Sequence, residues 1–210
     1  MKKLLVFIFL LLGSSQLFAD DFKEGVNYKA ISPQPTDSGD KIEVLEFFWY
    51  GCPHCYAFEP YLSAWKKKKP ANVEFVRIPA IFRPDWEAQA RAYYALGNMG
   101  LIDDLHGKIF NAIHKEKRRL NSLDMMADFL SRNGVDRKKF MAEANSFAVD
   151  AMVRKAKKKQ TAYRIQGVPT IAVNGKYVSS GSMAGSYENL IKIMDKLIKK
   201  EEKGRGKGKH

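Results

Sequence analysis

The spacing of apolar positions changes along the chain and divides it into a β/α segment, a helical block and a second β/α segment. The run KIEVLEFFWY (residues 41–50) is β-branched and aromatic and is bounded by glycines, which predicts a buried central strand. A helix is predicted from Pro53 to near Pro70, because proline suits a first helical position. The alternating run NVEFVRI (residues 72–78) predicts a second strand. Strand, helix and strand in this order favour parallel pairing through a right-handed crossover.

From Pro84 to about Gln160 the pattern is helical, and strands return only after this block. In PTIAVNGKYVSSG, the pair Asn174-Gly175 lies between two β-rich runs and predicts a hairpin. The segment SYENLIKIMDKLIKK then carries an apolar stripe at helical spacing and predicts a last helix. The simplest assembly is one small α/β sheet built from both ends of the chain, with the helical block inserted between them.

The N-terminus has the pattern of an export signal. Two lysines precede nine apolar residues, and Ala19 follows at a plausible cleavage site. Nine apolar residues are too few for a membrane span, which needs about 20. Residues 1–19 are therefore expected to be removed. The remaining parts are expected at residues 20–83, 84–160 (the helical insertion), 161–198 and 199–210.

Composition and charge indicate a globular protein with a basic end. Hydrophobic residues make up 45% of the chain and the formal net charge is +13. The last segment, KKEEKGRGKGKH (residues 199–210), has no apolar residue and is predicted to be a disordered tail. Such a tail could touch anionic lipid or nucleic acid. A solvated end is the simpler interpretation, and no specific nucleic-acid partner is expected.

Both cysteines of the chain lie in the tetrapeptide CPHC, as Cys52 and Cys55. A structural disulfide between them would close too small a loop to stabilise the fold much. A structural zinc site needs four ligands. The other internal histidines, His106 and His114, are eight residues apart and are expected to lie on the surface, so no metal site is predicted. A redox-active pair is the remaining interpretation.

The start of a helix suits such a redox pair. Residues i and i+3 come close enough there to form a disulfide. Cys52 would meet the positive end of the helix dipole, which favours the reactive thiolate. Pro53 fixes the turn, His54 adds a polar group beside the sulfur, and the deeper Cys55 would act as the resolving thiol. Stabilising the Cys52 thiolate also makes the disulfide easier to reduce.

Three longer motifs carry a family resemblance. The segments VLEFFWYGCPHCYAFEP, GVPTIAVNGKY and PDWEAQARAYYALG resemble the DsbA family of thiol:disulfide oxidases, a branch of the thioredoxin superfamily. The resemblance covers nearly all of residues 40–198. It implies a thioredoxin fold with an inserted all-helical domain. It also implies a periplasmic enzyme that donates its Cys52–Cys55 disulfide without a metal or a diffusible cofactor.

The resemblance also implies roles for single residues. Pro169 could be an ordinary strand-entry proline, but the family pattern makes it a cis-proline facing the disulfide, with Val168 offering backbone groups to a substrate peptide. Alternation leaves Glu46 either exposed at a strand edge or buried with a raised pKa. The family pattern makes it a buried acid that assists proton transfer at the deeper cysteine. Arg77 is expected in place of the lysine that pairs with this acid in the family.

The expected partners follow from the same resemblance. They are unfolded or reduced exported proteins as substrates, and a quinone-linked, DsbB-like membrane protein that restores the disulfide. The protein itself is expected to be a monomer. Two alternatives stay open on the sequence. One is a thiol-disulfide reductase or isomerase, and the other is a peptide-binding chaperone in which the cysteine pair is incidental.

Overall fold

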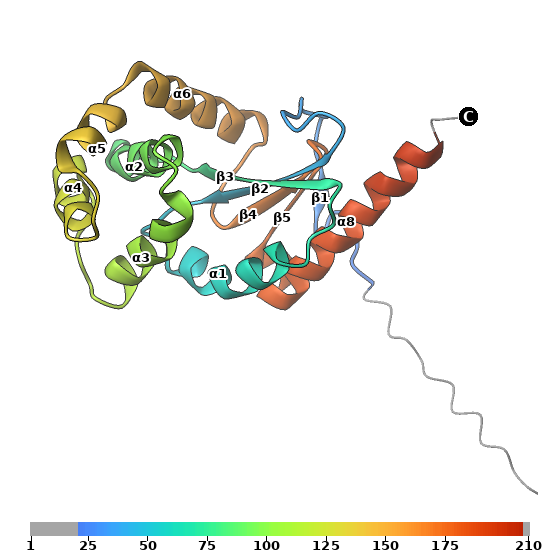
Figure 1. Ribbon diagram of the computed structural model, residues 1–210. Helices are drawn as coiled ribbons and strands as arrows, with labels where there is room; N and C mark the ends of the chain where they lie inside the picture. The colour runs from blue at the N-terminus through green and yellow to red at the C-terminus, as the bar shows by residue number, and fades with distance from the viewer. Residues whose placement is uncertain (1–20, 208–210) are drawn as a thin grey trace, which may run out of the picture.

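The computed structural model describes residues 21–207, and a mixed five-stranded sheet lies at its centre (Figure 1). The sheet order is β1-β5-β4-β2-β3, with β2 and β3 parallel and the other neighbours antiparallel. The predicted parallel pair and the predicted hairpin, β4–β5, are both confirmed. The strands are β1 (Lys29–Ala30), β2 (Ile42–Phe48), β3 (Val73–Pro79), β4 (Thr170–Val173) and β5 (Tyr177–Ser180).

Helices cover both faces of this sheet and continue beyond one of its ends. In Figure 1, α1 and α8 lie along one face, α6 lies over the other, and α2 to α5 gather at the end of the sheet. A short 3-10 turn, η1, precedes α2. The helical elements are α1 (Pro53–Lys66), η1 (Pro84–Trp86), α2 (Glu87–Asn98), α3 (Ile102–His114), α4 (Leu123–Ser131), α5 (Arg137–Ala144), α6 (Phe147–Ala162), α7 (Gly181–Ala184) and α8 (Tyr187–Lys207).

Strand β2 is the central element because helices bury it from both sides. All seven of its residues are buried. Val44 packs with the apolar side chains of α1 and α8, whereas Leu45 and Phe47 pack on the opposite face with Ala156 of α6. This double burial explains why the strand reads as a continuous apolar run rather than as a clean alternation. The predicted central strand is confirmed.

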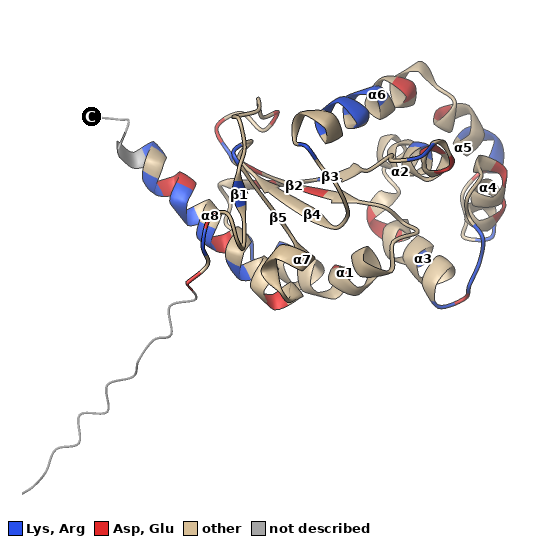
Figure 2. Cartoon of the chain, turned by 180° about the vertical axis from the view of Figure 1, so that it is seen from behind, with Lys and Arg blue, Asp and Glu red and all other residues tan. Residues whose placement is uncertain are grey.

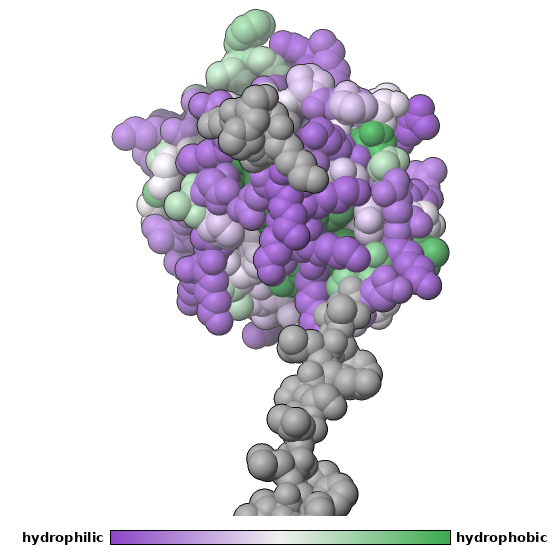
Figure 3. Space-filling model, turned by 90° about the vertical axis from the view of Figure 1, so that its right-hand side faces the viewer, coloured by the Kyte–Doolittle hydropathy of each residue, from purple (hydrophilic) through white to green (hydrophobic). Residues whose placement is uncertain are grey.

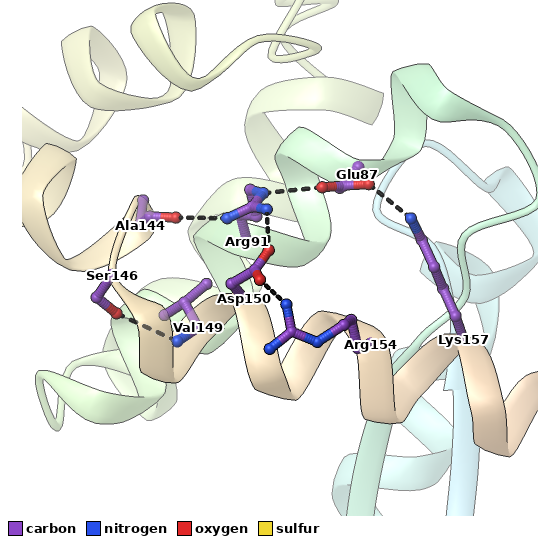
Figure 4. Close-up of polar contacts among 8 residues, drawn as sticks. All are labelled: Glu87, Arg91, Ala144, Ser146, Val149, Asp150, Arg154 and Lys157. Carbon is purple, nitrogen blue, oxygen red and sulfur yellow. Dashed lines mark hydrogen bonds and ion pairs between the residues drawn. The ribbon is translucent and has the colours of Figure 1, made fainter.

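Helices α2 to α6 form the insertion between β3 and β4, and charged side chains tie α2 to α6 (Figure 4). Arg91 is the centre of this network: its Nε lies 2.9 Å from Glu87 and its Nη2 lies 2.7 Å from Asp150. Arg154 pairs with Asp150, and Lys157 pairs with Glu87 at 2.7 Å. Arg154 and Lys157, two of the basic side chains on α6 (Figure 2), are therefore paired with carboxylates within this network.

The prediction of a disordered tail from residue 199 is wrong as far as residue 207. Helix α8 continues through this segment to Lys207. Glu201 is only 6% exposed and accepts hydrogen bonds from Asn174 Nδ2 at 2.6 Å and from Lys176 Nζ at 2.7 Å. Arg205 also donates to the carbonyl oxygen of Lys41 at 3.2 Å. These polar contacts to the β4–β5 hairpin and to the start of β2 replace the apolar contacts that the tail lacks.

Two further observations complete the description of the chain ends. The end of the molecule from which α8 projects is largely hydrophilic (Figure 3). Among residues 21–207, no helix is both long and apolar enough to cross a membrane. The predicted export signal, residues 1–19, lies outside the described residues.

The buried contacts of Glu201 lead to a prediction about the end of α8. Replacing Glu201 with Ala should lower the free energy of unfolding by about 1–3 kcal/mol, because the amide of Asn174 loses its hydrogen-bond acceptor. Its neighbour Glu202 makes a hydrogen bond at the surface, to Asn72, so Glu202→Ala should change stability by no more than about 0.5 kcal/mol. Urea unfolding of the two variants makes the comparison. Equal stabilities would mean that the contact does not anchor the helix.

Candidate functional site

The loop after β2 places Cys52 at the start of α1. Cys52 is the N-cap residue, with an extended backbone (φ −84°, ψ 116°), and Pro53 follows where a missing N–H costs nothing. The Sγ atom of Cys52 accepts a hydrogen bond from the backbone N–H of Cys55 at 3.4 Å. Both cysteines are thiols in this structure. A sulfur therefore takes the place of the usual capping oxygen.

Hydrogen bonding at this position lowers the pKa of the Cys52 thiol to about 6. The largest cause is the hydrogen bond from the Cys55 side chain. Burial opposes it, and the backbone N–H groups of Cys55 and His54 and the charge of His54 add to the lowering. The imidazole Nδ1 of His54 itself lies 3.3 Å from the hydroxyl of Tyr187. At neutral pH Cys52 is thus mostly thiolate, which is the form that acts as a nucleophile and as a good leaving group.

Cys55 lies one turn deeper and has the opposite character. Its side chain is fully buried. Burial raises the pKa of Cys55 well above its usual value, and the neighbouring Cys52 and Glu46 raise it further. The two thiols of one tetrapeptide therefore differ strongly in acidity, as the interpretation of an attacking and a resolving cysteine requires.

The segment before β4 faces Cys52 from the other side. The Val168–Pro169 peptide bond is cis, as the family resemblance implied. The Sγ of Cys52 lies 3.4 Å from the carbonyl oxygen of Val168. A groove of about 1070 Å³ starts here, between His54, the residues around Pro169 and residues 178–183, which form the end of β5 and the start of α7. The groove adjoins the acidic thiol, because Val168, whose carbonyl oxygen lies 3.4 Å from Cys52 Sγ, is one of its lining residues.

A buried ion cluster lies beneath the thiols. Glu46 is 0% exposed and accepts a hydrogen bond from Arg77 Nε at 2.8 Å. Parallel pairing of β2 and β3 places the two residues side by side. The Nη2 of Arg77 reaches both carboxylate oxygens of Glu59, at 2.8 and 3.0 Å. Burial raises the pKa of Glu46 to about 7, although Arg77 opposes this. The expectation that Arg77 stands beside the buried acid is confirmed.

The expectation that His106 lies on the surface is wrong. His106 is 5% exposed, and its ring nitrogens lie 2.8 Å from the hydroxyl of Tyr50 (Nδ1) and 3.2 Å from Glu59 Oε1 (Nε2). His114 is half-buried, and its Nε2 donates to the carbonyl oxygen of Tyr50 at 2.8 Å. His106 lies on the buried face of α3 together with Phe110, four residues later. That spacing was the signal in the sequence that could have placed it in the core.

The charged residues around the thiols do not form a metal centre. Within residues 21–207, no group of three or more His, Cys, Asp and Glu side chains is arranged to hold a metal ion. What the site combines is an acidic thiol, a buried thiol, a carboxyl with a raised pKa and an adjoining groove. These are the parts needed for thiol–disulfide exchange with a peptide.

Known proteins are similar to this chain in sequence and fold. A family model described as a DSBA-like thioredoxin domain matches residues 43–190. A thiol:disulfide interchange protein DsbA from Pseudomonas aeruginosa is 48% identical over 184 residues, which are 87% of each chain. The protein of the same name from Burkholderia cepacia is 42% identical over 205 residues, or 95% of this chain and 97% of the other.

Solved structures agree with these sequence matches. The crystal structure of Pseudomonas aeruginosa DsbA superposes with a TM-score of 0.86 at 46% identity, over 90% of this chain and 98% of that chain. The oxidoreductase DsbA from Xylella fastidiosa superposes with a TM-score of 0.79 at 33% identity, over 85% of this chain and 96% of that chain. The thioredoxin fold with a helical insertion is thus confirmed.

The hydrogen bond between the two thiols leads to a prediction. In the reduced protein, the thiolate absorbance of Cys52 should titrate with a midpoint of about 6. Replacing Cys55 with Ala should move this midpoint upward, because it removes the largest cause of the lowered pKa. In denaturant the cysteines of both proteins should titrate with a midpoint of about 8.5, the pKa of a free cysteine. An unchanged midpoint in the folded Cys55→Ala variant would rule out this hydrogen bond as the cause.

Proposed function

The chain belongs to the family of DsbA-like thioredoxin-domain proteins, and we propose that it forms disulfide bonds in reduced, exported proteins. The observation that carries this proposal is the contrast within one CxxC pair, in which Cys52 is acidic and Cys55 is buried with a raised pKa. A stabilised thiolate favours the reduced dithiol over the disulfide. The Cys52–Cys55 disulfide is therefore readily given away, which suits an oxidase rather than a reductase.

The reaction proceeds through a mixed disulfide. A substrate thiolate attacks the sulfur of Cys52, forms a new S–S bond and breaks the Cys52–Cys55 bond, whose electron pair leaves on Cys55. A second substrate thiolate then attacks the substrate sulfur of the mixed disulfide, and Cys52 leaves as a thiolate. The substrate is oxidised by two electrons and the protein is reduced to the dithiol. The low pKa of Cys52 makes it a good leaving group in the second step.

Glu46 supplies the proton that the first step needs. Cys55 leaves as a thiolate in a fully buried position, where an unpaired charge is costly. Glu46 lies near enough for its charge to raise the pKa of Cys55, and its own pKa of about 7 lets it hold a proton at neutral pH. Arg77 keeps its charge throughout because a guanidinium does not titrate in this range. Glu46 is thus the proton donor and Arg77 its fixed partner.

The groove beside Pro169 is the proposed binding site for the substrate. The backbone of Val168 faces Cys52 and offers polar groups to an extended peptide. Pro53 and His54 set the geometry and the acidity on the other side of the sulfur. Binding through backbone groups suits an enzyme that accepts many unfolded chains, because it does not depend on the substrate's side chains.

The proposed setting of this chemistry is the periplasm. Residues 1–19 have the pattern of an export signal, and disulfides persist in oxidising compartments. Each turnover leaves the protein as a dithiol, so an oxidant has to restore the disulfide. A quinone-linked, DsbB-like membrane protein is the proposed partner for this step. The protein is proposed to act as a monomer, with neither a metal nor a diffusible cofactor.

A redox titration tests the direction of the reaction. In glutathione buffers, the Cys52–Cys55 pair should be clearly more oxidising than thioredoxin, whose potential is about −270 mV. A value near that of thioredoxin would instead support the reductase alternative. The chaperone alternative predicts that Cys52→Ser leaves activity intact. We expect this variant to lose all oxidation of a reduced, unfolded substrate.

A substitution at Glu46 tests the proposed proton donor. Glu46→Gln should slow the reduction of the disulfide by a substrate thiol roughly 10- to 100-fold at pH 7, a small part of what acid–base catalysis can contribute. Because Glu46 is protonated below about pH 7, the proton-dependent part of the wild-type rate should fall above this pH and should be missing in the variant. Stopped-flow fluorescence between pH 5 and 9, in steps of about half a unit, measures both.

Glu43 provides the matched control for this experiment. It is also buried on β2, but it accepts hydrogen bonds from Asp37 and Ser38, away from the thiols. Glu43→Gln should therefore leave the exchange rate and its pH profile unchanged. Equal rates for Glu46→Gln and the wild-type protein would contradict the proposed role of Glu46.

A further inference from the structure

The buried cluster beneath the thiols is larger than the proposed reaction requires. Glu46 comes from β2, Glu59 from α1, Arg77 from β3 and His106 from α3, and Tyr50 joins them from the loop before Cys52. Successive contacts connect them in the order Tyr50, His106, Glu59, Arg77, Glu46. Only the last two have a part in the reaction described above. The helical insertion thus contributes a side chain to the ion cluster of the thioredoxin part.

The contacts of His106 determine where its proton lies. Both oxygens of Glu59 accept from Arg77, as those of an ionised carboxylate do, so Nε2 of His106 carries the hydrogen that points to Oε1. Burial lowers the pKa of His106, which keeps the ring neutral. A neutral ring has one N–H only, so Nδ1 is an acceptor. The Tyr50 hydroxyl therefore donates to Nδ1, and burial raises the pKa of Tyr50 and keeps this hydroxyl protonated.

The two carboxylates of the cluster are unequally supplied with donors. Glu59 accepts two contacts from Arg77 Nη2 and one from His106 Nε2. Glu46 accepts one hydrogen bond, from Arg77 Nε, and its Oε1 is buried without a hydrogen-bond partner among the described residues. Burial disfavours both charges. At Glu59 the hydrogen bond from His106 and the charge of Arg77, together with its hydrogen bonds, outweigh burial and lower the pKa, whereas at Glu46 burial prevails.

A count of charges leaves one proton to be placed. Two carboxylates share one guanidinium, so the cluster is neutral only when one carboxyl is protonated. We propose that His106 is a positioning residue, which holds Glu59 ionised through its Nε2–H and so leaves the single proton of the cluster on Glu46, beside Cys55. This inference rests on the proposed role of Glu46 as the proton donor. It means that α3 of the insertion has to be docked for the proton to lie where the reaction needs it.

Charged and titratable groups from several elements face these two carboxyls. Lys66 of α1 and Arg77 of β3 oppose the raised pKa of Glu46, and Glu59 adds to it. Arg77 also contacts Glu59. On the insertion, His106 faces Glu59 directly, and the ring of Tyr93 on α2 lies 6.0 Å from that of His106. Of these groups, only His106 and Arg77 make a hydrogen bond to Glu59. Arg77 contacts both carboxyls, whereas His106 makes a hydrogen bond to Glu59 and none to Glu46.

Substitutions at His106 test the proposal. In the reduced protein, the side-chain carboxyls of Glu46 and Glu59 can be titrated separately by ¹³C NMR with labelled glutamate. Phe at position 106 fills the space of the ring but donates no hydrogen bond to Glu59. In His106→Phe the titration midpoint of Glu46 should fall by about half a pH unit or more, a threefold loss of proton affinity, and Glu59 should take up part of the same titration step. In His106→Gln an amide N–H can replace Nε2–H, so the midpoint should stay near the wild-type value.

Glu59→Gln gives an independent route to the same result. It removes the negative charge that disfavours ionisation of Glu46, so the Glu46 midpoint should fall by about one unit or more. If His106→Phe fails to fold, this variant still tests the ionised state of Glu59 that the proposal requires. Circular dichroism and thermal unfolding establish which variants are folded.

His114→Phe is the control for packing alone. His114 also joins α3 to the redox loop, through the backbone carbonyl of Tyr50, and its ring stacks on Tyr56, but it makes no hydrogen bond to Glu59. This variant should leave the Glu46 midpoint unchanged. An equal shift in His114→Phe and His106→Phe would show that docking of α3, not the hydrogen bond, is responsible. No shift in folded His106→Phe would overturn the proposal, as would no shift in Glu59→Gln.

The proposal about His106 and the proposed role of Glu46 can be contradicted separately. The NMR titration reports where the proton lies and does not require turnover. If Glu46→Gln exchanges disulfides at the wild-type rate, Glu46 is not the proton donor. The midpoints of the His106 variants would still show whether His106 places the proton.

Discussion

The hydrogen bonds that hold the sulfur of Cys52 at the start of α1 are the interaction on which the rest of the site depends. An N-cap position offers backbone N–H groups that have no partner inside the helix, and here a thiol occupies it. Because a thiolate accepts hydrogen bonds more strongly than a disulfide sulfur does, these hydrogen bonds favour the dithiol. The acidity of Cys52 and its tendency to be reduced are therefore two results of one local geometry.

The exchange reaction also requires a proton for the second cysteine of the pair. Cys55 is fully buried, so a charge that appears on it during the reaction needs a proton from nearby. Glu46 of the sheet is the proposed source of this proton, and the parallel pairing of β2 and β3 places it against Arg77. Two carboxylates around one guanidinium are costly to bury unless one of them is protonated. The ion cluster thereby stores a proton beneath the thiols.

The helical insertion contributes to this chemistry as well as to the shape of the molecule. Its helices are tied together by the charges around Arg91, and its helix α3 reaches the redox loop through two histidines. Both polar ends of Tyr50, the hydroxyl and the backbone carbonyl, are held by this one helix. The segment that presents Cys52 is therefore fixed from the insertion side, while the groove on the opposite side remains open.

The sequence by itself determined the features that depend on the pattern of neighbouring residues. The apolar run of β2, the proline at the start of α1 and the Asn174-Gly175 turn each specify their element through neighbouring residues, and the CPHC motif with its flanking segments identified the family. The tertiary structure alone decided what depends on contacts between distant segments. His106 meets Tyr50 and Glu59 because α3 packs against the redox loop. Glu59 becomes functional because Arg77 reaches it from β3. The basic end is helical because Glu201 meets the β4–β5 hairpin. Such polar pairings have no periodicity that a single sequence could show.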